Sequence, residues 1–463
     1  MRKGSISIFT LLVMILVASV LFVLLEATRC QEIRRLSNLQ TQLALESAFA
    51  NYNPVLWEEY EVLGCDVSQL ERHVFERANC KADTSLRGLN LLRFGVQDFE
   101  TKEYTLLTDG GGAVYEQAVA SIMKETLVYG MAKELFNQYE VIKRLEKESN
   151  WSPLWLINGL SQELPEVEIT IENPMKEAVG IQNKGVLELV VDDMRMLSDK
   201  SLNLKELVSH RTLAQGKSPI IPENEWLDKV LLQQYILQNM SNYCSQIQHP
   251  GMAYEVEYVI GGKGSDIENL KYVVNRLLLL REMTNFLYLT SNAAKMEEAG
   301  VIALALAGTS VNPVVVEVVR MGIVAAWAFG ESVLDVRALL QGKKIPLLKS
   351  ASTWTLEISQ IASVTKGYFT AKECENGLSY QQYLGILLLF LQDNELSMHA
   401  MDMQEVALRM HERNGSFRMD EILVQAKLEI DYFTFPVFLT FYQLDYTFPE
   451  IYHIRTEQTY SYY

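Results

Sequence analysis

Residues 6–25 read ISIFTLLVMILVASVLFVLL and contain no charged side chain. At about 1.5 Å per residue, a helix of this length covers roughly 30 Å, the thickness of the hydrocarbon core of a bilayer. A secretory signal peptide has a shorter apolar core, of about 7–15 residues, followed by a small-residue cleavage site. Neither is evident here, so we expect Ile6–Leu25 to be a retained transmembrane helix. A cleaved signal peptide and a buried helix are the alternatives.

The basic residues around this span are nearly balanced, so they do not decide its orientation. Arg2 and Lys3 precede the span, and Arg29, Arg34 and Arg35 follow it. Cytoplasmic flanks usually carry the excess of Lys and Arg. A short N-terminal tail before a large C-terminal region favours a cytoplasmic N-terminus. We therefore expect a single-pass protein of the cell membrane, with residues 1–5 as a cytoplasmic tail and residues 51–463 extracellular.

The helical pattern continues past the span. Residues 26–50 contain no Gly or Pro, and Leu36, Leu39 and Leu43 recur at helical spacing. Pro54 predicts the end of the helix, because the residue before a proline avoids the α region. One interpretation is an anchor followed by a separate amphipathic helix. The sharper one is a pilin-like stalk over residues 26–50, whose helix lies half in lipid and half packed on a head domain.

Length and composition limit the remaining classes. The 463 residues include 58 acidic and 41 basic side chains, which gives a net charge of −17. That charge repels phosphate, so we expect no nucleic acid partner. The apolar content of 49%, with only 11 Pro, excludes a disordered chain. The length allows one large domain or two to three ordinary domains.

Beyond the stalk, helical and alternating patterns are mixed. This mixture predicts an α+β class that is mostly helical, with helices packed on small antiparallel sheets and a further division of the chain near residues 150–165. Helical spacing is found at residues 113–148, 223–247, 266–292 and 295–341, and alternation predicts strands at Val167–Ile171, Val186–Val191, Tyr254–Ile260 and Lys427–Tyr432.

Two carboxylates, Glu331 and Asp335, are four residues apart in a strongly apolar helical region, so they share one face. Such a pair can serve acid–base chemistry or bind a cation. More often, buried carboxylates pair with arginines and fix the packing of helices. We expect the second role, with Arg281 as the partner.

The five cysteines are too few and too scattered for a disulfide scaffold. Cys65 and Cys80 are close enough in sequence for a bridge that would contribute roughly 3 kcal/mol in an extracellular domain. Unpaired thiols are the equally open alternative.

No other motif predicts chemistry. The turn Gly261–Gly264 lacks the spacing of a phosphate-binding loop, because Lys263 is followed by Gly. No histidine pair has metal-ligand spacing, and no nucleophile elbow occurs. We therefore assign no catalytic, cofactor-binding or metal residue and expect no cofactor and no enzyme. A site assembled through space stays open.

Four segments resemble known families. KGSISIFTLLVMILVASVLFVLLEATR, at residues 3–29, is similar to the N-terminus of TadE/TadG-like proteins, the minor pseudopilins of Tad (Flp) pilus systems. FANYNPVLWEEYEVLGCD (Phe49–Asp66) resembles an uncharacterised family of Gram-positive membrane proteins with such an N-terminus, as do Tyr254–Asn285 and Ala326–Ser350. The resemblance implies association with Tad-like pilus or secretion genes, and it implies no activity.

The N-terminus departs from the type IV prepilin pattern at one position. Prepilins are cut after a Gly that is followed five residues later by Glu, which neutralises the amine of the neighbouring subunit. Here Gly4 is followed five residues later by Phe9. The sequence therefore does not predict prepilin cleavage or incorporation into a filament.

Together these features predict a surface-exposed structural or assembly component of a Tad-like pilus or secretion system. Its expected partners are the lipid bilayer, through Ile6–Leu25, and other Tad-like components. A membrane-tethered adhesin or sensor ectodomain is one alternative. A membrane-anchored enzyme whose site is not visible in the sequence is the other.

Overall fold

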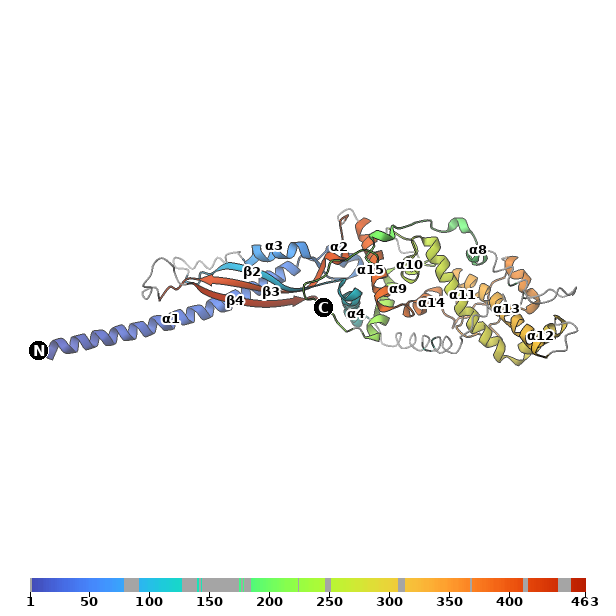
Figure 1. The fold of residues 1–463 in the computed structure, drawn as a ribbon, viewed down its shortest axis with the longest axis horizontal. Coiled ribbons are helices and arrows are strands. Elements are labelled where there is room, and N and C mark those ends of the chain that lie inside the picture. Colours follow the sequence, from blue (N-terminus) through green and yellow to red (C-terminus); the bar gives the residue numbers. More distant parts are fainter. Residues whose placement is uncertain are drawn as a thin grey trace. The chain divides into compact units, whose positions relative to one another are not determined.

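The computed structural model describes residues 2–78, 91–126, 140, 143, 175, 178, 185–223, 225–245, 251–306, 313–366, 369–410, 415–439 and 451–463. These residues form two compact units (Figure 1). Unit 1 consists of residues 1–118, 213–223 and 418–463, and unit 2 of residues 119–212 and 224–417. The division predicted near residues 150–165 lies outside the described residues.

Unit 1 combines one long helix with a four-stranded antiparallel sheet. Its elements are α1 (Arg2–Phe49), α2 (Pro54–Tyr60), β1 (Cys65–Asp66), α3 (Val67–Ala78), β2 (Gly95–Leu106), η1 (Asp109–Gly112), the start of α4 (Ala113–Thr126), η5 (Met419–Glu421), β3 (Ile422–Thr434) and β4 (Tyr452–Ser461).

Strand β3 is the centre of the sheet. It pairs with β2 along one edge, and with β4 and then β1 along the other. The expected strand Lys427–Tyr432 is thus confirmed within a longer one. Its alternation is strict: Ala426, Leu428, Ile430 and Tyr432 are fully buried, and the residues between them are partly exposed. The buried residues face one side of the sheet because successive side chains of a strand point to opposite faces.

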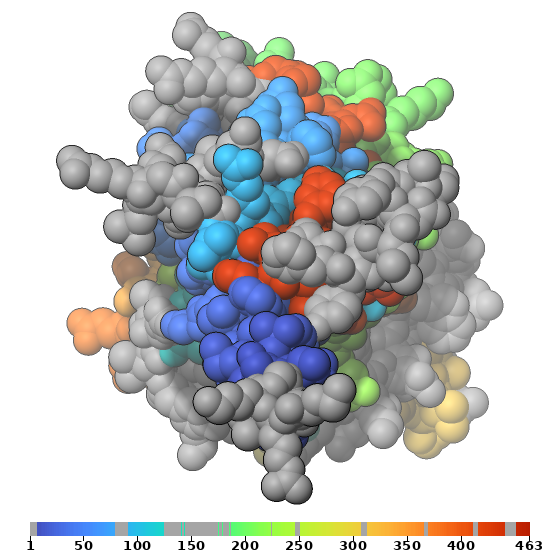
Figure 2. All heavy atoms as spheres, turned by 90° about the vertical axis from the view of Figure 1, so that its left-hand side faces the viewer, coloured from blue at the N-terminus to red at the C-terminus, as the bar shows by residue number. Residues whose placement is uncertain are grey.

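The predicted continuous helix is confirmed, since α1 runs unbroken for 48 residues. Its second half packs on the sheet, and its first half extends beyond the sheet (Figure 1). Figure 2 looks at the molecule from the side where α1 begins, and there the blue helix lies beside the red C-terminal strands. Ile33, Ala44, Leu45 and Phe49 of α1 are buried in the same core as β3.

The helix ends where the sequence predicted. Asn53 caps α2, because its side-chain oxygen accepts hydrogen bonds from the backbone N–H groups of Val55 and Leu56, both at 3.1 Å. Pro54 takes the first helical position, where a missing N–H group costs nothing. The break between α1 and α2 therefore follows directly from the residues Asn53 and Pro54.

All regular elements of unit 2 in the described residues are helical. They are α8 (Val186–Val190), η2 (Met194–Met196), η3 (Leu204–Glu206), α9 (Trp226–Asn239), α10 (Glu255–Gly261), α11 (Asp266–Ser291), α12 (Ala293–Leu306), α13 (Pro313–Leu340), η4 (Ile358–Lys366), α14 (Tyr380–Leu389) and α15 (Asp393–Met410). With the sheet of unit 1, they confirm the predicted α+β class with mostly helical content.

Two predicted strands are wrong. Of the first, residues 255–260 belong to α10, with Tyr254 as its N-cap, and of the second, residues 186–190 form α8. The alternation of residues 254–260 predicts that Glu255 and Glu257 are exposed to solvent, yet these side chains are 1% and 0% exposed. Glu255 accepts hydrogen bonds from the backbone N–H and hydroxyl of Ser241, at 2.8 and 2.9 Å. The alternation in the sequence therefore comes from buried carboxylates that have hydrogen-bond partners, and not from the solvent-exposed face of a strand. The strand predicted at 167–171 lies outside the described residues.

Strand β2 was missed because its alternation is broken. Its pairing with β3 shifts register between Val96 and Asp98, between Thr101 and Glu103, and at its end. Each extra residue in a strand moves the following side chains to the other face. The sequence of β2 consequently shows no sustained period of two.

Two helices in the described part of the chain are long and apolar enough to cross a bilayer, α1 and α13. None of the most apolar window of α1 is buried, whereas 56% of that of α13 is. From Gly322 to Leu340 every residue of α13 is buried within unit 2. Helix α13 is therefore a core helix of unit 2, whereas the apolar half of α1 is left exposed.

Candidate functional site

The apolar half of α1 ends at a buried ion pair. Glu26 and Arg29, one turn apart, are only 2% and 5% exposed, and their side chains meet at 2.6 Å. Arg29 also donates to the carbonyl oxygens of Phe435 (2.6 Å) and Leu91 (3.1 Å) and to the hydroxyl of Thr434 (3.3 Å). These contacts tie α1 to the turn end of the β3–β4 hairpin. We name Glu26, Arg29, Thr434 and the backbone of residues 435–438 the stalk clasp.

Glu26 holds the other side of the stalk clasp. Its Oε2 accepts hydrogen bonds from the backbone N–H groups of Val437 (3.2 Å) and Phe438 (2.8 Å). Burial alone would raise the pKa of Glu26, but the hydrogen bonds from Arg29 and these two N–H groups outweigh it and lower the pKa below its usual value. Glu26 therefore stays ionised and keeps its acceptors available.

A second set of hydrogen bonds fixes α1 to the middle of the sheet. The hydroxyl of Thr41 lies 3.0 Å from that of Tyr432 and 2.7 Å from that of Thr456, and all three side chains are buried. One turn from the C-terminal end of α1, Ala44 and Leu45 enter the apolar core. The second half of α1 is thus packed into the core of unit 1 and is not a free stalk.

In unit 2 the structure brings Arg281 of α11 to Asp335 of α13. The guanidinium donates to Oδ2 of Asp335 through Nε (3.1 Å) and Nη2 (2.9 Å). Its Nη1 donates to the carbonyl oxygens of Pro346 (3.0 Å) and Leu347 (2.8 Å). The Tyr383 hydroxyl is a further acceptor, at 3.0 Å. Arg281 thereby joins two helices to the segment that follows α13.

Glu331 pairs with a cation that the sequence analysis did not single out. Nζ of Lys349 lies 2.5 Å from Glu331 and 2.7 Å from Oδ1 of Asp335. Glu331 also accepts from the backbone N–H groups of Thr355 (3.1 Å) and Leu356 (2.7 Å). The four charged side chains of Arg281, Glu331, Asp335 and Lys349, which we name the charge network, are all fully buried at the side-chain level.

The charge network contains two positive and two negative groups. Burial and the charge of Asp335 raise the pKa of Glu331. Burial would also raise the pKa of Asp335, but Arg281 and Lys349 outweigh it and lower that pKa. Each group is occupied by another member or by backbone, so this arrangement can hold α11, α13 and residues 346–356 together. It offers no free group to a substrate.

A Ser, His and Asp meet elsewhere in unit 2, but not in the order of a hydrolase triad. Ser209 Oγ lies 2.6 Å from Oδ2 of Asp402 and 2.8 Å from Nδ1 of His210. In a triad the carboxylate orients the histidine, which takes the serine proton. Here the single hydroxyl proton goes to Asp402, so His210 can only donate to Ser209. Tyr258 also donates to Asp402, at 2.9 Å. Asp402 thus joins Ser209 to α10 and α15.

The Gly-rich turn closes α10 and opens α11. Gly262 has a φ of 59°, a left-handed conformation that Gly adopts without strain. Ser265 caps α11, since its hydroxyl accepts from the N–H of Glu268 at 3.4 Å. The turn joins two helices rather than a strand and a helix.

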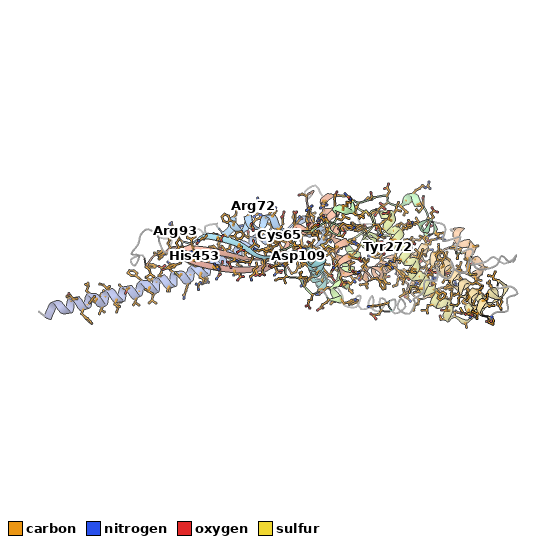
Figure 3. The ribbon with its side chains drawn as sticks, in the orientation of Figure 1. Cys65, Arg72, Arg93, Asp109, Tyr272 and His453 are labelled. Atoms are coloured by element: carbon orange, nitrogen blue, oxygen red, sulfur yellow. The ribbon has the colours of Figure 1, made fainter. Side chains whose placement is uncertain are left out.

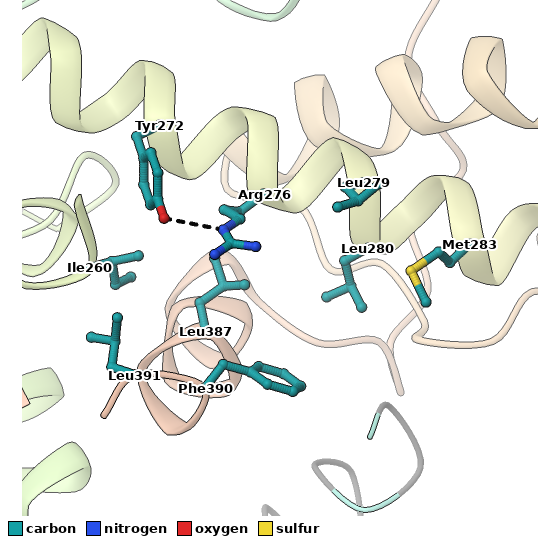
Figure 4. Close-up of a pocket in the computed structure, with 9 residues that line it drawn as sticks. All are labelled: Ile260, Tyr272, Arg276, Leu279, Leu280, Met283, Leu387, Phe390 and Leu391. Atoms are coloured by element: carbon teal, nitrogen blue, oxygen red, sulfur yellow. Dashed lines mark hydrogen bonds between the residues drawn. The ribbon is translucent and has the colours of Figure 1, made fainter. Parts of the chain in front are cut away.

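The part of the chain that the structure describes contains few accessible groups that could bind a metal or a ligand. No group of three or more His, Cys, Asp or Glu there could hold a metal ion. A hollow of about 250 Å³ lies between α11 and α14 (Figure 4), and most of its lining is apolar. Its two polar side chains bond to each other, because Nε of Arg276 donates to the hydroxyl of Tyr272 at 3.3 Å.

Cys65, the first residue of β1, is buried (Figure 3). Burial raises its pKa to about 12. Cys80 lies outside the described residues, so the Cys65–Cys80 bridge stays a prediction.

Sequence reasoning missed Glu26, Arg29 and Lys349 as site residues. A signal for the first two was present, because Glu26 and Arg29 stand one turn apart directly after a long uncharged run. Lys349 had no comparable signal, since it comes from a segment without helical spacing. Its role depends on a chain reversal that brings residues 346–356 back across α13.

The model of one protein family matches residues 165–434, more than half of the chain. The chain belongs to the family of unknown function DUF5702. The region matched by DUF5702 contains the charge network and β3, whereas α1, β2 and β4 lie outside it. No curated protein and no solved structure matches the chain. The family description assigns no activity, so functional inference depends on the arrangement of α1 and the two buried ion-pair sites.

Proposed function

We propose that this DUF5702 protein is a membrane-anchored, surface-exposed structural or assembly component of a Tad-like (Flp) pilus or secretion system, with a minor pseudopilin-like role. The observation that carries the proposal is the division of α1 at the stalk clasp. Up to Leu25 the large apolar side chains of the helix are exposed, and from Glu26 onward its inner face is part of a protein core.

This division has a simple physical reason. Exposed Leu, Ile, Val and Phe side chains along α1 are unfavourable in water and favourable in lipid, by roughly 25 cal/mol per Å² of apolar surface. The second half of α1 satisfies its own apolar face against the sheet. A helix that uses one half for lipid and the other for a head domain is what a subunit needs if it is to hold a large domain at a membrane surface.

Two further observations support an assembly role. Residues 3–29 resemble the start of TadE/TadG-like pseudopilins. Phe9 replaces the Glu that registers a subunit in a filament, which favours an accessory subunit over the main pilin. In this proposal the N-terminus is cytoplasmic, the bulk of the chain is outside, and the protein catalyses no reaction.

The test is deletion of the gene in a host that carries a Tad-like system. We expect loss of pili or of the secreted product, with restoration by the full chain. Unchanged pili and secretion would contradict the proposal. Loss of surface attachment alone, with normal pili, would favour the adhesin alternative.

Two controls sharpen this test. A chain in which residues 6–25 are replaced by an unrelated transmembrane helix of equal length separates anchoring from lateral packing of that segment. Protease treatment of intact cells carrying a C-terminal tag checks the orientation. Loss of the tag without lysis places the head outside, whereas full protection in wall-stripped cells contradicts the surface location.

A further inference from the structure

The turn end of the β3–β4 hairpin has an apolar surface of its own. Residues 435–439 read FPVFL. Phe435 is 48% exposed and Val437 is 38% exposed, and Ile451, on the return strand side, is 40% exposed. Exposed apolar side chains that cluster at the end of a hairpin indicate contact with another apolar phase, because their exposure to water is unfavourable.

The stalk clasp fixes this surface at a defined level of α1. The backbone N–H groups of Val437 and Phe438 bond to Glu26, and the carbonyl of Phe435 accepts from Arg29. Phe438 lies beside α1 on the N-terminal side of Glu26. Its ring stacks on that of Phe22, with centroids 6.5 Å apart and planes inclined by 17°.

The position of Phe22 gives the depth. It precedes Glu26 by four residues, which is about 6 Å along a helix. It also lies within the uncharged run that ends at Leu25. A phenyl ring stacked beside Phe22 therefore lies at the level of the last turn of that run, below the point where charged residues begin.

We propose that the β3–β4 hairpin end, through Phe435, Val437 and Phe438, inserts into the outer edge of the bilayer beside α1. The inference rests on the proposed function in one respect, namely that Ile6–Leu25 spans the membrane. The occupant of the apolar surface is phospholipid, because the surface is continuous with the bare apolar half of α1 through the Phe22–Phe438 stack.

Polar groups lie where such an insertion requires them. Arg93 is exposed, and its carbonyl accepts from Thr434 at 2.6 Å, so it lies at the same end of the sheet (Figure 3). His453, also exposed, pairs with Phe433 in the β3–β4 register. Cationic and aromatic side chains are typical of the headgroup layer. The head domain would then be held at two points, which restricts its tilt relative to the membrane.

The experiment is site-specific photo-crosslinking of the full chain in phosphatidylcholine vesicles. A benzophenone amino acid replaces Phe435 or Phe438, and lipid adducts are measured by mass spectrometry. Phe9 in α1, 67% exposed, is the position that reports the anchor, and Phe75 on α3, 54% exposed, is the matched position on the head. Adducts at Phe435 and Phe438 within about threefold of Phe9, and at least about tenfold above Phe75, are expected for groups that share the hydrocarbon edge.

The outcomes separate the inference from the function on which it rests. Adducts at Phe9 without adducts at Phe435 and Phe438 would overturn the hairpin insertion and leave the anchor intact. No adducts at Phe9 would overturn the anchor itself. Crosslinks from Phe435 to protein, in native membranes, would show that another subunit covers the surface. Phe435 is the safer position, since its exposed ring can change without disturbing the Phe22 stack.

Discussion

The stalk clasp of unit 1 and the charge network of unit 2 both bury ion pairs, but the pairs have different partners. In the stalk clasp, Glu26 and Arg29 come from one turn of one helix and spend their remaining hydrogen bonds on backbone groups of a hairpin. In the charge network, two cations and two anions from two helices and a following segment pair with one another, and their remaining hydrogen bonds go to backbone groups and side chains around them.

This difference indicates what each site protects. Removing one charge from the stalk clasp leaves backbone groups at the level of Glu26 and Arg29, where the charged residues of α1 begin, so water of the headgroup layer can replace the lost partner. Removing one charge from the charge network leaves its positive and negative groups out of balance by one charge, where no side chain is exposed. Water cannot reach this uncompensated charge, so the loss of unfolding free energy is larger.

Arg281→Met is expected to have the largest effect. It removes the only guanidinium that bridges α11, α13 and residues 346–347 in the described residues, and it leaves Asp335 with Lys349 as its cation. Breaking a buried pair from one side typically costs about 3–5 kcal/mol of unfolding free energy. Denaturant unfolding of the full chain in detergent, with hydrogen exchange of α11 and α13, measures the loss.

Arg276→Met is the matched control, because Arg276 lies on the same helix and is exposed. It should change the unfolding free energy by less than about 1 kcal/mol. Equal effects of the two substitutions would mean that the charge network does not hold unit 2 together.

Glu282→Gln tests a buried acid that adjoins the charge network in sequence but takes no part in it. Burial raises the pKa of Glu282 from 4.5 to about 8. Between those values the folded state binds the proton more strongly than the unfolded state, so stability is full below about pH 5 and falls as the pH rises toward 8. The fall due to this group is about 2–4 kcal/mol.

The measurement is the unfolding free energy of the wild type and Glu282→Gln from pH 5 to pH 8. The difference between them should grow with pH in favour of the variant, since an amide does not ionise. Glu268→Gln, at an exposed position of α11, should run parallel to the wild type. A difference curve without slope would show that Glu282 reaches solvent or a cation in solution.

The sequence predicted elements that depend on local patterns. The unbroken α1 and the alternation of β3 both follow from neighbouring residues. Four-residue spacing also shows that Glu331 and Asp335 share a face of α13. It cannot show which cation reaches them, because Lys349 arrives through a reversal of the chain.

The missed features depend on long-range pairing. Strand β2 acquires its bulges only against β3, and α10 hides its carboxylates only because Ser241 and other groups fold over them. The stalk clasp belongs to the same class. Glu26 and Arg29 are one turn apart on α1, but their backbone partners in the β3–β4 hairpin lie some 400 positions later in the chain. Local periodicity contains no information about such partners.

Arg29→Met tests the stalk clasp itself. It removes the donor to Phe435, Leu91 and Thr434 and the counter-ion of Glu26. We expect a loss of about 2–3 kcal/mol, smaller than for Arg281→Met, because Arg29 lies beyond the uncharged run, at the level where water of the headgroup layer can reach the freed groups. Hydrogen exchange should show faster exchange of the Val437 and Phe438 amides. Arg35→Met, at an exposed position of α1, is the control, and unchanged amide exchange in Arg29→Met would contradict the clasp.

Thr41→Val is expected to have the smallest effect of the four, because it removes neutral hydrogen bonds and preserves shape. The variant loses the contacts of the Thr41 hydroxyl with Tyr432 and Thr456, so two buried hydroxyls lose a partner. This costs about 1–2 kcal/mol. Thr28→Val makes the same change at an exposed position, where the hydroxyl bonds only to its own helix, and should be nearly neutral. If the two variants have the same unfolding free energy, α1 is attached to the sheet by its apolar face and the stalk clasp, and the hydroxyl contacts of Thr41 contribute nothing.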